Sequence, residues 1–230
     1  MALATVHLLR HGEVYNPEGV LYGRLPEYHL SDRGTAMAAL AAEFFQRRRD
    51  GQDGAEGKLG VKRPFVYLAA SPLVRAQETA AATAMALGLG LETDSRLIEA
   101  GNRFEGLRMS VRELLKPRNA RWLYNPLRPS WGEPYAEQVL RMRAAIDHAR
   151  AEAVSRGGSG AQAVLVSHQL PIWVSRLALE GRALAHDPRK RACSLASVTS
   201  VEFDDDRVLR VDYAEPAASL ALGAATTPGA

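Results

Sequence analysis

The sequence contains one cysteine, Cys193, among 230 residues. A single cysteine excludes an intrachain disulfide and any metal site built from a cysteine cluster, so we interpret Cys193 as a buried or half-buried apolar side chain. Long apolar runs are also missing, because no stretch approaches the ~18 uninterrupted apolar residues of a membrane span. The N-terminal residues lack the basic region and apolar run of a signal peptide. We therefore expect a cytoplasmic protein without a membrane partner.

Composition and charge exclude little more. The hydrophobic share of 47% and the charged share of 24% are those of an ordinary globular protein, and 230 residues suffice for one buried core. The net charge of +3 is mildly basic. Basic residues gather at 47–49 and 62–63, but no aromatic residues alternate with them and no nucleic-acid motif accompanies them. We expect no nucleic-acid partner, and the role of the basic loop 47–63 stays open.

The most informative stretch is residues 6–13. Its apolar run of β-branched and bulky residues predicts a buried strand, which ends abruptly in Arg10, His11 and Gly12. Open α/β sheets bind their ligands in the crevice beyond the carboxyl ends of the strands, and glycine there lets the backbone approach a ligand closely. A lone histidine is more often structural than catalytic, so this tripeptide gains meaning only from matching segments elsewhere.

Three later segments have the same form, an apolar run that ends in a polar residue able to hold or donate to an anion. They are residues 68–71 followed by Arg75, residues 97–99 and residues 164–168. Together with residues 6–13, and in this order, they resemble the histidine phosphatase superfamily, branch 1, which includes the phosphoglycerate mutases. Residues 71–80 also match the superfamily pattern Ser-Pro-x-x-Arg-Ala-x-x-Thr-Ala.

Strands and helices alternate along the chain with turn signals between them, which predicts an α/β fold. The strands are expected at 6–9, 65–70, 91–99, 162–167, 197–203 and 208–213, and the main helices at 35–49, after 71, at 133–156 and after 168. The resemblance implies a three-layer α/β/α sandwich with a central, mostly parallel sheet, phosphoglycerate mutase-like. We expect one domain over 1–213, a variable cap at 103–132, and a disordered tail at 214–230.

The resemblance implies a phosphate site at the ends of these strands. His11 is the expected nucleophile, since an imidazole with a pKa near 6.5 is largely neutral at neutral pH. Arg10, Arg75 and His168 would surround the phosphoryl oxygens with charge-assisted donors. We place Ser71 as the cap of a helix and Arg75 about one turn into it, on its first exposed face.

The resemblance also implies a carboxylic acid that protonates the leaving oxygen. Glu99 is the best match, and Glu105 is the alternative, because the interval from Glu99 to Gly106 is one residue shorter than in the superfamily. Asn16 and Arg24 match positions that contact phosphate and substrate. The loop before Asn16 is also one residue short, and asparagine before proline is otherwise a common turn former.

Gln169 stands where the superfamily usually has glycine, so we expect its side chain to line the pocket and alter substrate choice. The cap at 103–132 is expected to set that choice as well. Arg103, Arg108, Arg112, Arg118 and Arg121 are candidates there for a second anion subsite, although most arginines in such a segment would simply be solvated.

These residues predict a metal-independent phosphomonoester hydrolase that acts through a phosphohistidine on a small phosphorylated metabolite. We expect no metal and no cofactor. The first alternative is a 2,3-bisphosphoglycerate-dependent phosphoglycerate mutase, although the residues after Glu99 lack the tyrosine and paired arginines that such mutases place on the substrate carboxylate. The second is an inactive scaffold of the same fold. The oligomeric state stays open, with a homodimer among the states that the resemblance allows.

Overall fold

The structure, a computed structural model, describes residues 2–52, 63–108, 111–122 and 131–221. Most of the basic loop 47–63, part of the expected cap and the last nine residues of the expected tail lie outside these ranges. The strands are β1 (Leu3–Arg10), β2 (Phe65–Ala70), β3 (Glu92–Thr93), β4 (Ala161–Ser167), β5 (Val198–Asp204) and β6 (Arg207–Ala214). The helices are α1 (Asp32–Arg49), α2 (Val74–Leu87), α3 (Val111–Leu114), α4 (Pro117–Ala120), α5 (Tyr135–Gly157), α6 (Gln169–Leu179) and α7 (Ala218–Ala221), with short 3-10 turns η1 (Ser95–Leu97) and η2 (Pro188–Lys190).

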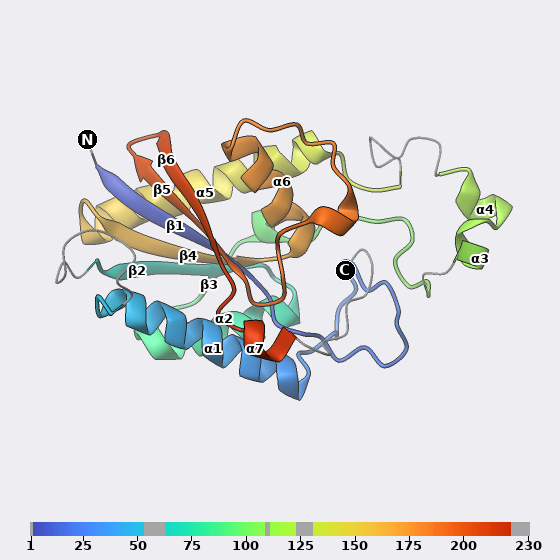
Figure 1. The fold of residues 1–230 in the computed structure, drawn as a ribbon, viewed down its shortest axis with the longest axis horizontal. Coiled ribbons are helices and arrows are strands. Elements are labelled where there is room, and N and C mark those ends of the chain that lie inside the picture. The colour runs from blue at the N-terminus through green and yellow to red at the C-terminus, as the bar shows by residue number, and fades with distance from the viewer. Residues whose placement is uncertain (1, 53–62, 109–110, 123–130, 222–230) are drawn as a thin grey trace.

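One six-stranded sheet in the order β3-β2-β4-β1-β5-β6 forms the centre of the molecule (Figure 1). The strands β3, β2, β4 and β1 are parallel to one another, whereas β5 and β6 join as an antiparallel hairpin at one edge. The fold is therefore an α/β fold with a mixed, mostly parallel sheet, as the sequence predicted. The hairpin turn is the predicted acidic one, with Asp205 at a positive φ of 52°.

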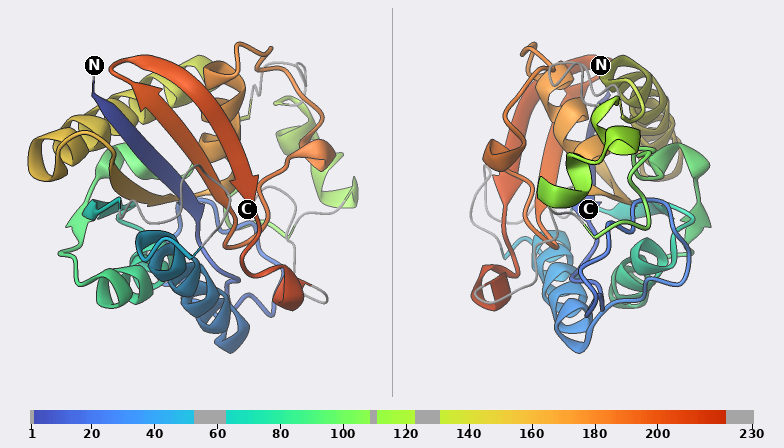
Figure 2. Two further views of the ribbon diagram at one scale, coloured as in Figure 1. Left: turned by 60° about the vertical axis from the view of Figure 1, so that its left-hand side comes forward. Right: turned by 90° about the vertical axis from the view of Figure 1, so that its right-hand side faces the viewer.

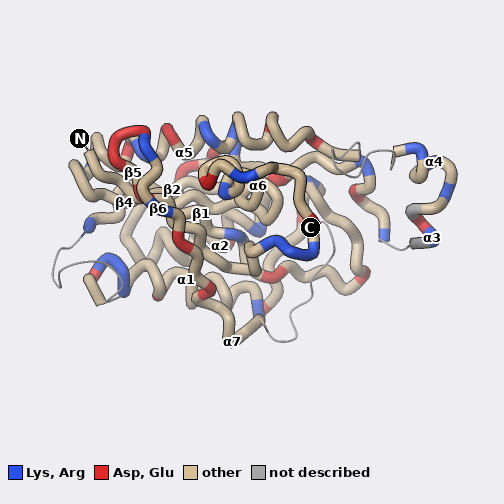
Figure 3. Tube along the Cα trace, turned by 45° about the horizontal axis from the view of Figure 1, so that its top comes forward, with Lys and Arg blue, Asp and Glu red and all other residues tan. Residues whose placement is uncertain are grey.

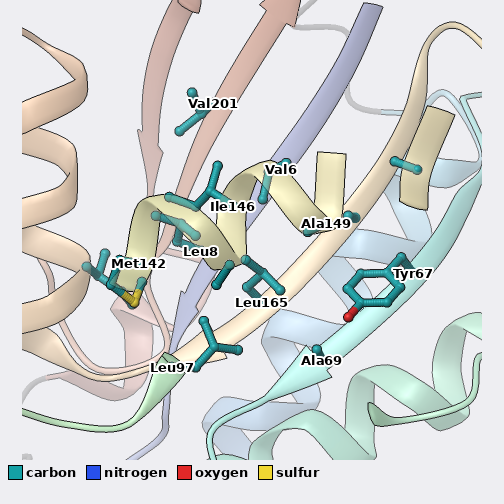
Figure 4. Packing of buried hydrophobic residues seen from close by; sticks show 14 of the residues in the cluster. Val6, Leu8, Tyr67, Ala69, Leu97, Met142, Ile146, Ala149, Leu165 and Val201 are labelled. Atoms are coloured by element: carbon teal, nitrogen blue, oxygen red, sulfur yellow. The ribbon is translucent and has the colours of Figure 1, made fainter. Parts of the chain in front are cut away.

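Helices cover both faces of the sheet. Figures 1 and 2 show α5 and α6 on one side and α1 and α2 on the other. Successive side chains of a strand point to opposite faces, so Leu8 joins the core under α5 while Leu9 joins the core over α1. Figure 4 shows the first of these cores, where Met142 and Ile146 of α5 pack on Leu8 and Leu165 of the central strands.

The loop after β1 packs tightly against the start of α1. Ser31 caps this helix, since its side chain accepts a hydrogen bond from the backbone N–H of Gly34. A Cβ atom at Gly12 would lie 2.5 Å from the Gly34 carbonyl oxygen, and one at Gly34 would lie 1.9 Å from the Glu13 carbonyl oxygen. Both glycines are therefore required for the close approach that fixes the chain just after His11.

The second helix begins later than the sequence predicted. Its N-cap is Leu73, which makes no side-chain capping bond, so the expected Ser71 cap is wrong. The Ser71 hydroxyl lies 2.8 Å from Nε2 of the buried His168 ring instead. The expectation for Arg75 is also wrong, because this side chain is 0% exposed rather than on the outer face of the helix.

The segment before Glu99 is a turn rather than a strand. Only Glu92–Thr93 pair with the sheet, and the chain then forms η1, whose cap Asp94 accepts a hydrogen bond from the Arg96 backbone N–H. The expected strand over 91–99 is therefore wrong for most of its length. Glu99 therefore follows a 3-10 turn instead of the end of a strand.

The tail is ordered for part of its length. The strand β6 continues to Ala214, and α7 follows it. Ala217 is 2% exposed and packs in the core beside α1 and α2. The expected disorder is therefore wrong for residues 214–221, while residues 222–230 lie outside the described part of the chain.

The region expected as a cap contains two short helices, α3 and α4, at one end of the molecule (Figure 1). Basic positions mark both of them in Figure 3. Three of the arginines proposed there make surface contacts. Arg118 pairs with Glu113, and Arg108 pairs with Glu18. The guanidinium carbon of Arg103 lies 4.1 Å from the ring centre of Trp122.

A buried histidine inside β1 predicts acid sensitivity of the fold. His7 lies between Ser200 and Gln162, with ring nitrogens 2.8 and 2.9 Å from their side-chain oxygens, and burial together with Arg48 lowers its pKa from 6.5 to about 3. Below pH 6.5 the unfolded chain binds a proton that folded His7 does not, so the free energy of unfolding falls as the pH drops.

We expect this histidine alone to remove roughly 2 kcal/mol of stability between pH 6.5 and pH 5. Urea unfolding at the two pH values measures the loss. His7→Gln retains hydrogen-bonding atoms but does not titrate, so its loss should be smaller by that amount. An unchanged loss would show that His7 does not control the acid sensitivity.

Candidate active site

The candidate site lies at the carboxyl ends of the three central parallel strands. His11 follows β1, Ser71 follows β2 and His168 follows β4. Arg10 is paired in register with Ser167, so the two strands end at the same level. Because parallel strands end on the same side of a sheet, residues far apart in the sequence come together there, as the motifs predicted.

His11 presents one ring nitrogen without a partner. Its Nδ1 donates to the Gly12 carbonyl oxygen at 2.7 Å, which fixes the proton on that nitrogen because a carbonyl only accepts. Nε2 is buried and has no hydrogen-bond partner in the described part of the protein. The free electron pair of Nε2 is therefore available to attack a bound ligand.

The surroundings of His11 keep its ring neutral. Burial, followed by the charges of Arg75 and Arg10, holds the pKa of His11 well below its ordinary value of 6.5. The ring remains unprotonated at neutral pH, and the nitrogen that the tautomer exposes carries no proton. This is the state that a nucleophilic imidazole requires.

His168 faces His11 across the site. The two ring centres are 5.1 Å apart, and Nε2 of His168 lies 2.8 Å from the Ser71 hydroxyl. Its Nδ1 is buried without a partner in the described residues. Burial, Arg75 and the neighbouring His11 lower the pKa of His168. His168 is also the N-cap of α6, so unpaired backbone N–H groups of that helix begin beside it.

Two buried guanidinium groups supply positive charge. Arg75 donates through Nη2 to the Gly23 carbonyl at 2.5 Å, while its Nε and Nη1 have no partner among the described residues. The guanidinium carbon lies 4.7 Å from the ring centre of Tyr22. Arg10 is 6% exposed and donates to the Cys193 carbonyl at 2.7 Å. The buried N–H groups of Arg75 that have no partner among the described residues are costly unless an anion accepts from them.

The structure separates the two candidate acids. Glu99 is 5% exposed and accepts the Ala100 backbone N–H at 2.7 Å. Burial raises the pKa of Glu99, although that N–H and Arg75 oppose the shift. Glu105 instead accepts the backbone N–H groups of Arg24 and Asn102 at 3.1 and 3.2 Å, so it ties two loops together. Glu99 is therefore the carboxyl group suited to carry a proton.

Arg24 holds the Glu99 segment in place. Its Nε donates to the Glu99 carbonyl oxygen at 2.6 Å, and its Nη2 lies 2.8 Å from a carboxylate oxygen of Glu133. Direct contact between Arg24 and substrate stays a prediction. In the structure this side chain acts on the backbone that carries the acid.

With Glu99 as the expected acid, Arg24→Met should lower kcat by about 10- to 100-fold, because a misplaced acid loses its alignment with the leaving oxygen. Steady-state kinetics on an alkyl and an aryl phosphate measure the effect. The loss should be larger for the alkyl ester, whose leaving group depends more on protonation, and Arg24→Lys should restore part of it. Equal losses on the two esters would assign Arg24 a purely structural role.

Two further predicted residues, Asn16 and Gln169, bond to neighbouring parts of the chain. The Asn16 side chain bonds to both backbone groups of Val20, at 2.8 and 3.1 Å, as a turn former would, and its contact with phosphate stays a prediction. Gln169 donates to the Cys193 carbonyl at 3.3 Å and accepts a hydrogen bond from Arg191 at 3.4 Å. Gln169 lines a hollow beside Glu99.

The motifs do not reveal two residues of this site. Tyr22 covers Arg75, and Arg191 lies in the hollow beside Glu99. Ser71 does end one of the matched segments, but its contact with His168 was not predicted. The only sequence signal for Tyr22 is its place before Gly23 in the loop. Arg191 belongs to a charged, aperiodic segment that gives no local sign of a site.

The described residues contain no set of three or more His, Cys, Asp or Glu side chains arranged to hold a metal ion. None of their helices is both long and apolar enough to cross a membrane.

Comparisons with known proteins agree with this geometry. The chain is 48% identical over 215 residues to the uncharacterised protein Rv0525 of Mycobacterium tuberculosis, covering 93% of this chain and 96% of that one. The fold of the present chain is similar to that of mycobacterial glucosyl-3-phosphoglycerate phosphatase Rv2419c in complex with inorganic phosphate. The TM-score is 0.68 at 23% identity, and the match covers 93% of this chain and 98% of that one.

A phosphoglycerate mutase from Bacillus anthracis is similar too, with a TM-score of 0.66, 22% identity, and 96% of each chain covered. At these identities the two structures establish the fold alone, which is phosphoglycerate mutase-like. The model of the histidine phosphatase superfamily (branch 1) matches residues 6–215. This match spans nearly the whole chain and every strand end that forms the site, so the protein belongs to branch 1 of the histidine phosphatase superfamily.

Proposed function

We propose that the protein is a metal-independent phosphomonoester hydrolase that acts on a small phosphorylated metabolite through a phosphohistidine on His11. The observation that carries the proposal is the state of the His11 ring. Its Nδ1 proton is held by the Gly12 carbonyl, and the bare Nε2 is buried near Arg10 and Arg75. A nucleophilic nitrogen surrounded by cations suits an electrophile that carries negative charge, as a phosphoryl group does.

In the first step, Nε2 of His11 attacks phosphorus, and a phosphorus–nitrogen bond forms as the phosphorus–oxygen ester bond breaks. The proton of Glu99 moves to the departing oxygen, which leaves as an alcohol. Arg10, Arg75 and His168 donate hydrogen bonds to the phosphoryl oxygens as their negative charge spreads. Glu99 is left as a carboxylate.

In the second step, that carboxylate takes a proton from a water molecule whose oxygen attacks phosphorus. The phosphorus–nitrogen bond breaks, the electron pair returns to Nε2, and inorganic phosphate is released. Glu99 is protonated again and His11 is neutral again, so the cycle closes without another reactant. One carboxyl group thus serves as acid and then as base.

A mutase is the alternative, since it uses the same phosphohistidine and returns the phosphoryl group to a sugar acid instead of water. A phosphatase and a mutase both occur among the proteins of similar fold, so the fold alone does not choose between them. We favour the hydrolase, because the residues after Glu99 lack the tyrosine and paired arginines expected of a mutase. An inactive scaffold is less consistent with an intact set of site residues.

The test incubates the purified protein with a metal chelator and a panel of phosphomonoesters, including 3-phosphoglycerate with its bisphosphate cofactor. Free phosphate and 2-phosphoglycerate are both measured. Free phosphate in the presence of chelator is the expected result. Formation of 2-phosphoglycerate without net phosphate would identify the mutase, and loss of activity with chelator would contradict a metal-independent reaction.

A further inference from the structure

A hollow of about 190 Å³ opens beside Glu99. Residues 99–102 form one wall, positions between 131 and 138 form a second, and Gln169 and Arg191 contribute to a third. The hollow shares Glu99 and Gln169 with the candidate active site, and a leaving group whose oxygen Glu99 protonates would extend into it. Its chemistry therefore bears on which phosphomonoester fits.

Arg191 contributes a positive charge to this hollow without a carboxylate partner. Its Nε donates to Nε2 of His186 at 3.0 Å and its Nη1 donates to the Gln169 side-chain oxygen at 3.4 Å. It also interacts with the Tyr135 hydroxyl. All three partners are neutral groups, and among the described residues Arg191 forms no ion pair.

Neither acid that lines the hollow forms an ion pair with Arg191. Glu133 lies 2.8 Å from Arg24 and 2.7 Å from Arg141, so two other guanidinium groups already balance its charge. Glu99 lies within electrostatic range of Arg191, but burial raises the pKa of Glu99 and favours its uncharged form. A largely buried guanidinium without a counter-ion is costly, and a bound anion would remove that cost.

His186 fixes the direction of Arg191. Its Nδ1 donates to the Leu184 carbonyl at 2.7 Å, so the ring is the tautomer whose Nε2 accepts from Arg191. The ring stacks on Tyr135 with centres 5.3 Å apart. With Nε and one Nη1 hydrogen engaged, the remaining guanidinium N–H groups are left for Tyr135 and for a ligand.

Gln138 adds a second group of the hollow that a ligand could satisfy, a hydrogen-bond acceptor. Its Nε2 donates to the Glu133 carbonyl at 2.9 Å, whereas its Oε1 is buried and has no partner among the described residues. The residue is 0% exposed and lines the hollow. A buried acceptor without a donor is unfavourable, and a ligand hydroxyl would satisfy it.

We propose that this hollow binds the leaving group of the substrate, and that Arg191 binds a second negative charge on it, a carboxylate or a second phosphate, while Gln138 accepts a hydrogen bond from a hydroxyl. The substrate is then the phosphomonoester of an acidic, hydroxylated small molecule. This inference rests on the proposed phosphatase function and names its substrate class. It places a residue that determines substrate specificity, Arg191, in the connection between α6 and β5 and not among the arginines of α3 and α4.

Two matched pairs of esters test the proposal. Glycerol 3-phosphate and 3-phosphoglycerate differ by a carboxylate, and fructose 6-phosphate and fructose 1,6-bisphosphate differ by a phosphate. In the wild type, kcat/KM should favour the more acidic member of at least one pair, and that pair identifies the anion. Arg191→Gln should lower the ratio of the two kcat/KM values by about 10- to 100-fold, which is what the loss of a charge-assisted hydrogen bond costs. Arg191→Lys keeps the charge and should retain part of the preference.

Arg189→Gln is the matched control, because it removes the same charge from the same connection at a side chain that is 88% exposed and paired with Asp187. The control should keep the wild-type ratio. An equal fall of the ratio in both variants would show that only the overall charge matters. A wild type that prefers the less acidic member of both pairs would overturn the proposal.

Binding to the His11→Ala variant separates this inference from the proposed function. Calorimetry with the same four esters measures affinity without turnover, on full-length protein with and without Arg191→Gln. If no ester is hydrolysed by the wild type, the proposed function fails. The affinity ratios within the two pairs still show whether Arg191 binds the second negative charge. A carboxylate or phosphate preference that is lost with Arg191→Gln supports the site, and equal affinities within both pairs refute it.

Discussion

His11→Ala is expected to lower kcat for phosphate release by about 10⁴-fold or more, down to the level of residual binding effects. Alanine removes the only atom that we propose bonds to phosphorus. The cationic surroundings of Arg10 and Arg75 remain, so affinity for inorganic phosphate should fall far less than kcat. Steady-state kinetics and phosphate binding by calorimetry together measure the two effects.

Chemical trapping gives the same prediction an independent readout. Wild-type protein quenched during turnover of a labelled ester should carry label on His11 that is stable to base and lost in acid, as a phosphorus–nitrogen bond is. His11→Ala should carry none. His148→Ala is a suitable control, since that histidine is exposed on α5 and lies outside the site. Label that persists in His11→Ala would place the nucleophile elsewhere.

Much of this site was predictable because its residues follow strands. Arg10, His11 and His168 occupy positions where an apolar run stops, and β1 and β4 pair in parallel, so the two motifs meet at one edge of the sheet. The hydrophobic pattern that predicts a strand thus also predicts the place of the residue after it. The strand pattern predicted where these residues lie, and the resemblance to the superfamily supplied the roles expected of them.

Arg75 shows why burial was harder to predict than position. Helical spacing places it on the first turn of α2, and nothing in the helix itself distinguishes a solvated face from a covered one. Gly23 and Tyr22 belong to a loop about fifty residues earlier, and they cover the guanidinium. Only tertiary packing brings that loop over the helix, so the sequence pattern led to the wrong environment.

Local polar chemistry explains two other differences. Asp94 bonds to the backbone and side chain of Arg96, which stabilises a 3-10 turn where the apolar residues after it favoured a strand. Ser71 was expected to cap α2, but its hydroxyl contacts Nε2 of the fully buried His168, and a buried polar atom requires a hydrogen-bond partner. Propensity rules do not include such distant partners.

The second prediction with a large effect concerns Glu99. We expect Glu99→Gln to lower kcat by about 10²- to 10⁴-fold on alkyl phosphates, because glutamine cannot transfer a proton to the leaving oxygen. On p-nitrophenyl phosphate, whose leaving group departs as an anion, the rate of the first step should fall much less. Rates for a series of esters with leaving groups of different pKa measure this dependence.

Glu105→Gln is the matched control for the alternative acid, since it makes the same chemical change one loop away. It should weaken the ties to the backbone of Arg24 and Asn102 and should leave the dependence on leaving-group pKa as it is in the wild type. A steeper dependence in Glu105→Gln than in Glu99→Gln would reverse the assignment of the acid.

The pH dependence of kcat/KM tests the expected protonation states of Glu99 and His11 together. Glu99 must be protonated in the first step, and burial raises its pKa above the ordinary value of 4.5, so kcat/KM should fall as the pH rises through that raised pKa. His11 must be neutral, and its lowered pKa places the acid limb well below pH 6.5. Glu99→Gln should abolish the alkaline limb and keep the acid one. A variant that retained both limbs would show that another group supplies the proton, and the hollow beside Glu99 would then no longer mark the path of the leaving group.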